Sequence, residues 1–330
     1  MILFADVGGT KTLFGLADAV ASDGAVHMLA TQRYLASEVP SFEVALQDFL
    51  QSHALVISRP LRAACFGVAG PVDGQSIQMT NLPWRLDATV LSRLLQGIPV
   101  RLVNDFYAAA SGIDALGPGD LMPLQANEAL LGGHQLVIGA GTGLGVAWRV
   151  WGDGRYQIVS GEGGHLGFSP INELQSRCMQ RLQALVDRVV VEHFVSGPGL
   201  AHWYACLGDT GPARLATAAE PLEPSAQDVI RRAMVDGEER AFLALDQFLL
   251  SYGAAAAGYA LMLLARGGVF VAGGIAVRLG DMMRDGRFMS GFHRQGPYEA
   301  LLKSLPVNVV TQADLGLLGA ALEARKLLNP

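Results

Sequence analysis

The sequence predicts an α/β protein with about two domains. Predicted strands alternate with helical segments along the 330 residues, which implies largely parallel sheets packed against helices. At roughly 150 residues per domain, this length corresponds to about two domains. A strand–glycine turn–strand pattern occurs near the start of the chain and again near Gly141. We interpret the pair as a weak internal repeat, with one hairpin opening each of two similar halves.

The first hairpin spans residues 3–17, LFADVGGTKTLFGLA. Gly8-Gly9-Thr10 forms its turn, and Asp6 ends its first strand. Glycines let successive backbone N–H groups converge on a phosphate, and a neighbouring carboxylate is well placed to hold a magnesium ion on that phosphate. An ordinary Gly-Gly hairpin is the alternative. The chain has neither a Walker loop nor a dinucleotide fingerprint, so this hairpin is the first candidate for nucleotide binding.

The rest of the first half predicts further strands and helices. Ser41 is a candidate helix cap, because apolar residues recur at helical spacing after it. The strand at 99–103 ends at Asn104-Asp105, and the polar-aromatic loop MTNLPW covers 79–84. The other elements expected in this half are a strand at 32–36, a helix from Ser41, a strand at 62–68, helices at 88–96 and 106–112, and a turn-rich break at 116–120.

The second half begins with the hairpin at 135–150, in which Gly141-Thr142-Gly143 echoes the first turn. Two such hairpins, each with a threonine, strengthen the hypothesis of nucleotide binding. The glycine-rich loop at 160–170 carries Glu162 and His165. The elements expected after it are helices at 174–191, 226–236 and 238–264, a strand at 268–274 closing on Gly273-Gly274, a strand at 307–311, and a final helix at 317–328.

Composition excludes several classes of protein. Apolar residues make up 51% and charged residues 16% of the chain, which suits large cores and argues against disorder. The apolar run 254–265 is too short to span a bilayer, and no signal peptide is indicated. A net charge of −6 without a basic cluster argues against a nucleic-acid partner. Cys65, Cys178 and Cys206 fit neither a disulfide framework nor a zinc site. We therefore expect a cytoplasmic protein without membrane attachment.

The ordered motifs resemble the bacterial glucokinase family, within the sugar kinase/hsp70/actin (ribonuclease H-like) fold. The motifs are DVGGT at 6–10, TNLPW at 80–84, VND at 103–105, GAGTGLG at 139–145, EGGH at 162–165, SGPGL at 196–200 and VAGGI at 271–275. The resemblance implies two α/β domains around a central interdomain cleft. The small domain would be 1–113, completed by the C-terminal helix at about 312–330, and the large domain would be 114–311.

The resemblance also implies an ATP:hexose 6-phosphotransferase that converts glucose to glucose 6-phosphate with ATP and Mg²⁺. ATP would lie between the two hairpins, with its adenosine near Gly273-Gly274, and Asp6 would hold Mg²⁺ through water. The residues implied for ATP are Ala5, Asp6, Val7, Gly8, Gly9, Thr10, Gly141, Thr142, Gly143, Gly273 and Gly274.

Asp105 is the implied catalytic base, accepting the proton of the sugar 6-hydroxyl. Its position at the carboxyl end of a parallel strand is where open α/β sheets bind ligands. From position alone, capping of the following helix is an equal alternative. Asn104 would bind the sugar or help form the turn.

Glu162, His165 and Glu192 resemble the glucokinase residues that bind the sugar hydroxyls, and Asn81 would line the same pocket. Carboxylates accept hydrogen bonds from hydroxyls, and imidazole both donates and accepts them. A solvated loop acid is the alternative for Glu162, and a satisfied core histidine is the alternative for His165.

Three departures from the family pattern have no assigned role, at Lys11, at Gly167 and at Gly154-Arg155-Tyr156. Lys11 follows GGT where Asn is common, which is more typical of the related repressor/ORF/kinase family, and Gly167 stands where Asp is common. That related family has a zinc-binding cysteine cluster after its E-x-G-H motif. Here only Cys178 follows His165 closely, so no structural zinc is expected.

The rival functions are a kinase for mannose or an N-acetylated hexose and a non-catalytic sugar sensor. A sensor would be expected to lack the base or to carry a DNA-binding segment. The resemblance makes a homodimer the expected assembly.

Overall fold

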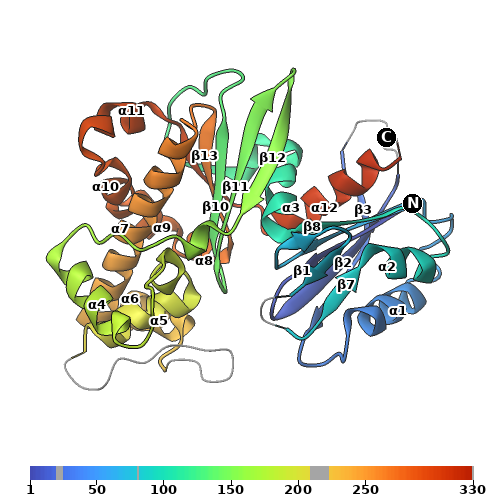
Figure 1. Ribbon diagram of the computed structural model, residues 1–330, viewed down its shortest axis with the longest axis horizontal. Helices are drawn as coiled ribbons and strands as arrows, with labels where there is room; N and C mark the ends of the chain where they lie inside the picture. The colour runs from blue at the N-terminus through green and yellow to red at the C-terminus, as the bar shows by residue number, and fades with distance from the viewer. Residues whose placement is uncertain (20–24, 80–81, 209–222, 329–330) are drawn as a thin grey trace. The chain divides into compact units, whose positions relative to one another are not determined.

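The computed structural model describes residues 1–19, 25–79, 82–208 and 223–328 (Figure 1). The chain forms two compact units. Unit 1 comprises Met1–Asp120, Ile158–Ser160 and Gln312–Pro330, and unit 2 comprises Leu121–Gln157 and Gly161–Thr311. Each unit is built on its own mixed sheet with helices packed against it, so the predicted α/β class is confirmed.

Unit 1 contains a five-stranded sheet in the order β3-β2-β1-β4-β8. Strand β1 pairs antiparallel with β2 and parallel with β4, which pairs parallel with β8. The carboxyl ends of β1, β4 and β8 therefore meet at one edge of the sheet. The strands are β1 (Ile2–Val7), β2 (Lys11–Ala17), β3 (Met28–Leu35), β4 (Ala63–Val68) and β8 (Val100–Asn104).

Both faces of this sheet are buried, as alternation along β1 shows. Leu3, Ala5 and Val7 join one apolar core, whereas Ile2 and Phe4 join another on the opposite face. The first core includes residues of α1 (Phe42–Ser52) and α2 (Ala88–Leu94), and the second includes residues of α3 (Asp105–Gly112) and α12 (Leu315–Lys326). The predicted cap is confirmed, because the Ser41 side chain accepts a hydrogen bond from the backbone N–H of Val44 at 3.3 Å. A small second sheet contains β5 (Val72–Asp73), β6 (Ser76–Gln78) and β7 (Arg85–Asp87), and the short helices η1 (Ile113–Ala115) and η2 (Pro118–Asp120) end the first segment of the unit.

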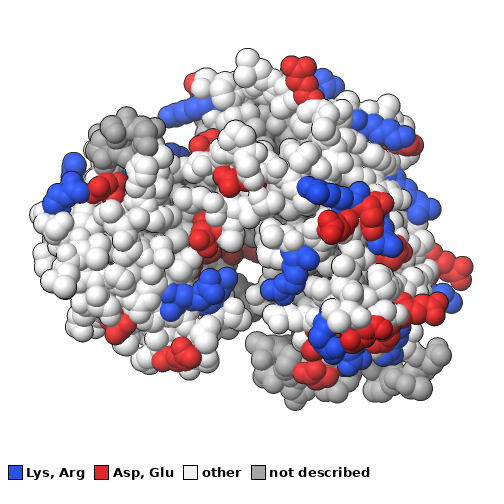
Figure 2. All heavy atoms as spheres, turned by 180° about the vertical axis from the view of Figure 1, so that it is seen from behind, with Lys and Arg blue, Asp and Glu red and all other residues white. Residues whose placement is uncertain are grey.

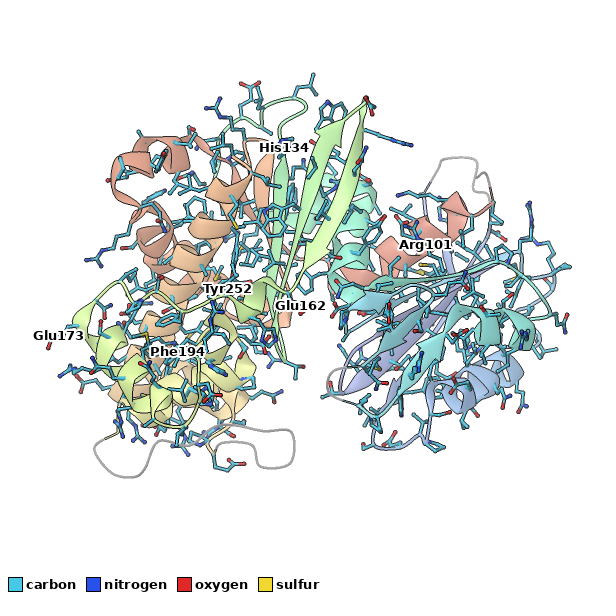
Figure 3. The ribbon with its side chains drawn as sticks, in the orientation of Figure 1. Arg101, His134, Glu162, Glu173, Phe194 and Tyr252 are labelled. Carbon is cyan, nitrogen blue, oxygen red and sulfur yellow. The ribbon has the colours of Figure 1, made fainter. Side chains whose placement is uncertain are left out.

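A buried carboxylate fixes the C-terminal helix α12 in unit 1. The Glu323 side chain has no exposed surface. It accepts hydrogen bonds from the Arg101 guanidinium at 2.5 Å and from the Ser111 hydroxyl at 2.6 Å. Arg101 is labelled beside α12 in Figure 3. The charge pair joins β8 to α12, and Lys326 on the same helix donates to Glu323 Oε1 at 2.6 Å, so the buried carboxylate has two cationic partners.

Unit 2 repeats the strand plan of unit 1. Its six-stranded sheet has the order β12-β11-β10-β13-β14-β9. Strand β10 pairs antiparallel with β11 and parallel with β13, and β13 pairs parallel with β14. A central hairpin followed by two parallel strands thus occurs in both sheets, which confirms the predicted repeat. The strands are β9 (Leu121–Gln125), β10 (Gln135–Ala140), β11 (Leu144–Gly152), β12 (Arg155–Gly161), β13 (Gly268–Ala272) and β14 (Val307–Val310).

Helix α7 (Glu239–Met262) is the longest element of unit 2 and contributes many residues to its apolar core. The Tyr252 hydroxyl on this helix, labelled in Figure 3, accepts a hydrogen bond from the backbone N–H of Ala140 at 3.0 Å, which ties α7 to the end of β10. The other helical elements are η3 (Gly163–His165), α4 (Glu173–Gln183), η4 (Val191–His193), α5 (Gly197–Cys206), α6 (Ala226–Met234), α8 (Gly274–Arg278), α9 (Gly280–Arg284), α10 (Arg287–His293), η5 (Gly296–Tyr298) and α11 (Glu299–Ser304).

The prediction of one helix over 174–191 is wrong, because α4 ends at Gln183. The segment that follows is rich in valine, and β-branched residues favour extended backbone over helix. Phe168 N–H donates to Val189 O at 3.1 Å and Val191 N–H donates to Leu166 O at 2.9 Å. Pairing with the loop after η3 therefore replaces the helical hydrogen bonds expected here.

Most of the apolar run 254–265, expected to be too short to cross a membrane, lies in the longer helix α7, which ends at Met262. Within the part of the chain that the structure describes, α7 alone has the length and composition of a membrane span, with 24 residues and a mean hydropathy of 1.2. Of that apolar window, 61% is buried inside the molecule. A core helix passes the same test, and α7 packs as one.

Charged side chains of both signs are interspersed over the described face of the molecule in Figure 2. That face shows no broad region of one sign among its described residues, in line with the modest net charge of −6.

Candidate active site

The carboxyl edge of the unit 1 sheet carries the predicted acidic residues. Strand register places Asp6 of β1 beside Gly67 of β4, and Val68 of β4 beside Asn104 of β8. Asp105 follows directly as the first residue of α3. The sheet therefore brings Asp6 and the Asn104-Asp105 pair to the same edge, where parallel α/β sheets bind ligands.

Asp6 lies in a setting that disfavours its charge. Although part of the side chain reaches solvent, desolvation by the surrounding protein raises its pKa to about 6. Lys11 acts in the opposite direction, and Asp314 adds to the rise. A Cβ atom added to Gly316 would lie 3.2 Å from the Asp6 carboxyl carbon, so the carboxylate lies against the first turn of α12.

The same edge suits a magnesium ion held partly by substrate. Among the described residues, no group of three or more His, Cys, Asp or Glu side chains could hold a metal on its own. Mg²⁺ commonly takes only one or two carboxylates and completes its shell with water and phosphate oxygens. A cation near Asp6 and Asp314 would relieve their mutual repulsion, so these donors fit. Asp314 was not predicted; its place just before the final helix, near a strand end, was the available signal.

The turn of the first hairpin is closed by a hydrogen bond from Gly8 N–H to Lys11 O at 2.9 Å. Gly8 and Gly9 are partly exposed and Thr10 is exposed, so this turn is open to a ligand. The side chains of Ala5 and Val7 are fully buried in the core, which leaves only their backbone for a role in nucleotide binding.

Asn104, and not Asp105, caps helix α3. Its side-chain oxygen accepts hydrogen bonds from Phe106 N–H at 3.0 Å and Tyr107 N–H at 3.2 Å, and its amide nitrogen donates to Gly70 O at 3.2 Å. Asp105 Oδ1 accepts from Phe106 N–H at 2.9 Å. These bonds are the ones that the turn-forming role of Asn104 requires, and they give the helix a cap that does not depend on Asp105 alone. Asn81 lies outside the described residues.

In unit 2, the EGGH loop presents its polar residues outward. Glu162, labelled in Figure 3, and His165 are exposed, whereas Gly163 and Gly164 between them are buried. The Tyr259 hydroxyl anchors the loop by donating to Gly163 O at 2.6 Å. The core-histidine alternative for His165 is thus wrong, because its side chain faces solvent.

Glu192 joins the second hairpin to this loop. Its Oε2 accepts a hydrogen bond from the backbone N–H of Leu144 at 2.7 Å. A Cβ atom added to Gly143 would lie 2.5 Å from the same oxygen, and one added to Gly164 would lie 3.1 Å from it. The three predicted segments of unit 2, namely the glycine hairpin, the EGGH loop and Glu192, therefore meet at one place.

The second hairpin is itself held by neighbouring backbone. Gly141 N–H donates to Gly143 O at 2.8 Å, and Gly197 N–H, at the start of α5, donates to Gly141 O at 2.8 Å. Gly273 follows β13 with φ of +92°, and a Cβ atom there would lie 2.8 Å from Ala140 O. Only glycine fits this crossing without strain, which places Gly273-Gly274 beside the end of β10.

Gly167, the unassigned departure, pairs with Val190 in an isolated bridge. A Cβ atom added to it would lie 3.3 Å from a guanidinium nitrogen of Arg188. Any larger residue here would require that arginine to move.

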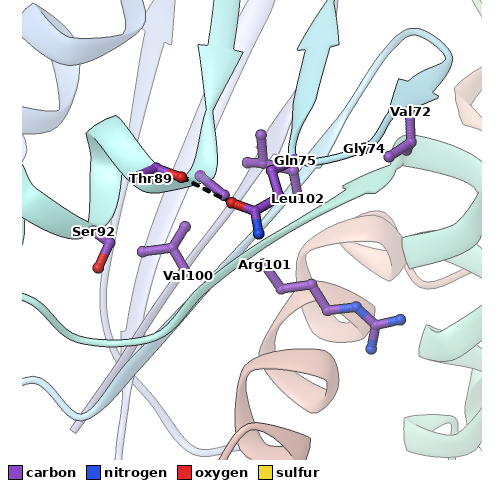
Figure 4. Close-up of a pocket in the computed structure, with 9 residues that line it drawn as sticks. Val72, Gly74, Gln75, Thr89, Ser92, Val100, Arg101 and Leu102 are labelled. Atoms are coloured by element: carbon purple, nitrogen blue, oxygen red, sulfur yellow. Dashed lines mark hydrogen bonds between the residues drawn. The ribbon is translucent and has the colours of Figure 1, made fainter.

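A separate pocket of about 520 Å³ opens in unit 1 (Figure 4). Its polar side chains already have partners: Thr89 donates to Gln75 at 2.8 Å, Ser92 to Ile98 O at 2.7 Å, and Arg101 to Glu323 at 2.5 Å. It contains none of the predicted site residues. We therefore assign the candidate site to the strand edges described above and not to this pocket.

Comparison with known proteins identifies the family. The family model described as glucokinase matches residues 3–327. The chain belongs to the glucokinase family. The glucokinase of Synechocystis sp. is 36% identical over 341 residues, which cover 97% of this chain and 96% of that relative.

Solved structures show the same fold. A crystal structure of glucokinase from an Antarctic psychrotroph has a TM-score of 0.81 and 27% identity, covering 100% of this chain and 99% of the other. A ROK family glucokinase from Streptomyces griseus, solved with glucose and AMPPNP, has a TM-score of 0.66 at 22% identity, covering 98% and 99% of the two chains. The actin/hsp70-like two-domain fold expected from the motifs is confirmed.

Proposed function

We propose that this chain transfers the γ-phosphoryl group of ATP to the 6-hydroxyl of glucose, giving glucose 6-phosphate and ADP. The observation that carries the proposal is the glucokinase family match over residues 3–327. The glucose and AMPPNP bound to the Streptomyces griseus relative support the same pair of substrates.

Asp105 is the proposed general base. It lies where β8 ends and α3 begins, and helix capping is already supplied by Asn104. Its carboxylate would accept the proton of the 6-hydroxyl as the sugar oxygen bonds to the γ-phosphorus and the bond to the β–γ bridging oxygen breaks. A positioned base of this kind contributes about 10²- to 10⁴-fold to the rate.

The sugar hydroxyls would be bound by Glu162, His165 and Glu192, with Asn104 and Asn81 as further ligands. Both Glu162 and His165 are exposed and hold polar atoms available for hydroxyls. Because Glu192 Oε2 already accepts from Leu144 N–H, we assign Oε1 to the sugar. The Glu192 carboxylate would then link sugar binding to the conformation of the second hairpin.

The two glycine hairpins, at Gly8–Thr10 and Gly141–Gly143, are the proposed phosphate-binding turns, and Gly273-Gly274 is the proposed adenosine contact. Asp6, through water and beside Asp314, would hold Mg²⁺, which when bound neutralises charge on the β- and γ-phosphates. The backbone N–H groups of both turns would bind the remaining phosphate oxygens.

A hexose panel with ATP and magnesium tests the proposal. Purified protein is assayed by ADP release with glucose, mannose and N-acetylglucosamine. We expect glucose to give the highest kcat/KM. Preference for another hexose would keep the kinase and change its substrate, whereas no turnover with any hexose would leave the sugar-sensor alternative. We further propose a cytoplasmic homodimer that acts in glycolysis, to be checked by sedimentation and fractionation.

A further inference from the structure

Helices α4 and α5 bring two of the three cysteines together, although they are 28 residues apart in sequence. Cys178 lies on α4, and Cys206 is the last residue of α5. The Cys206 thiol donates to the backbone oxygen of Cys178 at 3.8 Å, so the two cysteines are neighbours across the α4–α5 contact. Both line a pocket of about 440 Å³ that also contains Arg177 and Arg181.

The two thiols differ in their surroundings. Cys206 is partly exposed, and its pKa is lowered, first by the hydrogen bond from Cys178 and then by Arg181. Cys178 is buried, and the same hydrogen bond, together with desolvation, raises its pKa. The accessible thiol is therefore the one favoured as thiolate, and the buried thiol beside it remains protonated.

We propose that Cys178 and Cys206 form a peroxide-sensitive thiol pair that closes to a reversible disulfide. The Cys206 thiolate attacks one oxygen of hydrogen peroxide, the O–O bond breaks, and the product is a sulfenic acid with hydroxide, which takes up a proton to give water. The Cys178 sulfur then attacks the sulfenic sulfur, the S–O bond breaks, and loss of the thiol proton with the hydroxide releases a second water. Peroxide is reduced, and the two thiols are oxidised.

The disulfide would close the segment that contains Glu192, since this residue lies between the two cysteines in sequence. It would also join α4 to the end of α5, whose first residue, Gly197, holds Gly141 of the second hairpin. The pair thus flanks the unit 2 part of the candidate site without belonging to it.

Cys65 provides an internal control. Its side chain is fully buried in the unit 1 core, and desolvation raises its pKa. A thiol without access to solvent and with little thiolate reacts slowly. Selective oxidation should therefore spare Cys65 while the protein remains folded.

The test uses the full-length reduced protein treated with hydrogen peroxide, then alkylated without reductant, digested and mapped by mass spectrometry. We expect a Cys178–Cys206 linked peptide that dithiothreitol removes, with Cys65 alkylated only after denaturation. In Cys178→Ser, dimedone should trap a sulfenic acid on Cys206, and Cys206→Ser should remove both products. Disulfides between molecules, oxidation of Cys65 first, or unlinked Cys178 and Cys206 would each overturn the proposal. The mapping does not depend on kinase activity, so it stands or fails apart from the proposed function.

Discussion

Replacing Gly143 by alanine tests whether Glu192 links the second hairpin to the sugar site. The added Cβ would lie 2.5 Å from Glu192 Oε2, which is too close for that oxygen to stay, and 3.1 Å from its carboxyl carbon. The carboxylate must move, and the 2.7 Å hydrogen bond from Leu144 N–H must lengthen or break. Hydrogen bonds to charged groups contribute about 1.5–3 kcal/mol.

This loss corresponds to a fall of about 10- to 150-fold in kcat/KM for glucose, since about 1.4 kcal/mol equals a factor of ten. The assay couples glucose 6-phosphate formation to its dehydrogenase, with circular dichroism to check folding. Gly152→Ala is the matched control. Gly152 is the last residue of β11, the second strand of the same hairpin, and nothing lies within 4 Å of a Cβ added there. We expect this control to keep wild-type kinetics.

A double-mutant cycle decides the mechanism. If Gly143→Ala acts through the carboxylate, it should have little further effect once Glu192→Ala has removed that carboxylate. Full additivity of the two changes, or wild-type kcat/KM in a folded Gly143→Ala, would refute the link between hairpin and sugar site.

Three further predictions address the other parts of the molecule. Asp105→Asn should lower turnover by about 10²-fold or more while glucose binding stays measurable by calorimetry, and turnover within about tenfold of wild type would contradict its role as base. Gly316→Ala, whose Cβ would lie 3.2 Å from the Asp6 carboxyl carbon, should raise the magnesium concentration needed for half-maximal activity by several-fold, and an unchanged requirement would separate Asp6 from the metal. Burial lowers the pKa of His202, so the folded state binds fewer protons than the unfolded state, and stability should fall by up to about 1.4 kcal/mol per pH unit as pH drops below about 6.5. The free energy of unfolding, measured in urea at several pH values, should depend less steeply on pH in His202→Gln than in the wild type. An equal pH dependence would exclude this histidine as a cause.

The hairpin repeat was predictable because it is local. Two short strands and a glycine turn can be recognised within 15 or so residues, and the topology of both sheets follows from these hairpins and the parallel strands after them. The end of α4 was not predictable in the same way. The valine-rich segment after Gln183 pairs with residues 166–168, so its conformation is set by a tertiary partner and not by its own periodicity.

The cap of α3 shows that the roles of two adjacent residues, Asn104 and Asp105, depend on where the helix begins. The sequence Asn104-Asp105 offers two side chains of nearly equal capping ability, and position alone left both roles open. The structure gives Asn104 two backbone N–H groups of the helix and the Gly70 carbonyl. Asp105 shares only the Phe106 N–H with Asn104, so the helix end keeps a cap when the Asp105 carboxylate takes part in chemistry.

The same reasoning applies to Glu192, which sequence position made the least distinctive of the predicted sugar ligands. Its role becomes visible only when Gly143, Leu144 and Gly164 are seen around one carboxylate. A side chain at Gly143 would occupy the space of Oε2, and one at Gly164 would crowd the same oxygen and clash with Leu144 O, so both glycines permit close approach. The glycines of the second hairpin therefore meet two requirements. They let the backbone approach a phosphate, and they leave room for the Glu192 carboxylate, which connects the turn to the proposed sugar site. The hairpin sequence alone predicts only the phosphate contact. It does not predict the contact with Glu192, because that residue is 48 positions away from Leu144 in the chain.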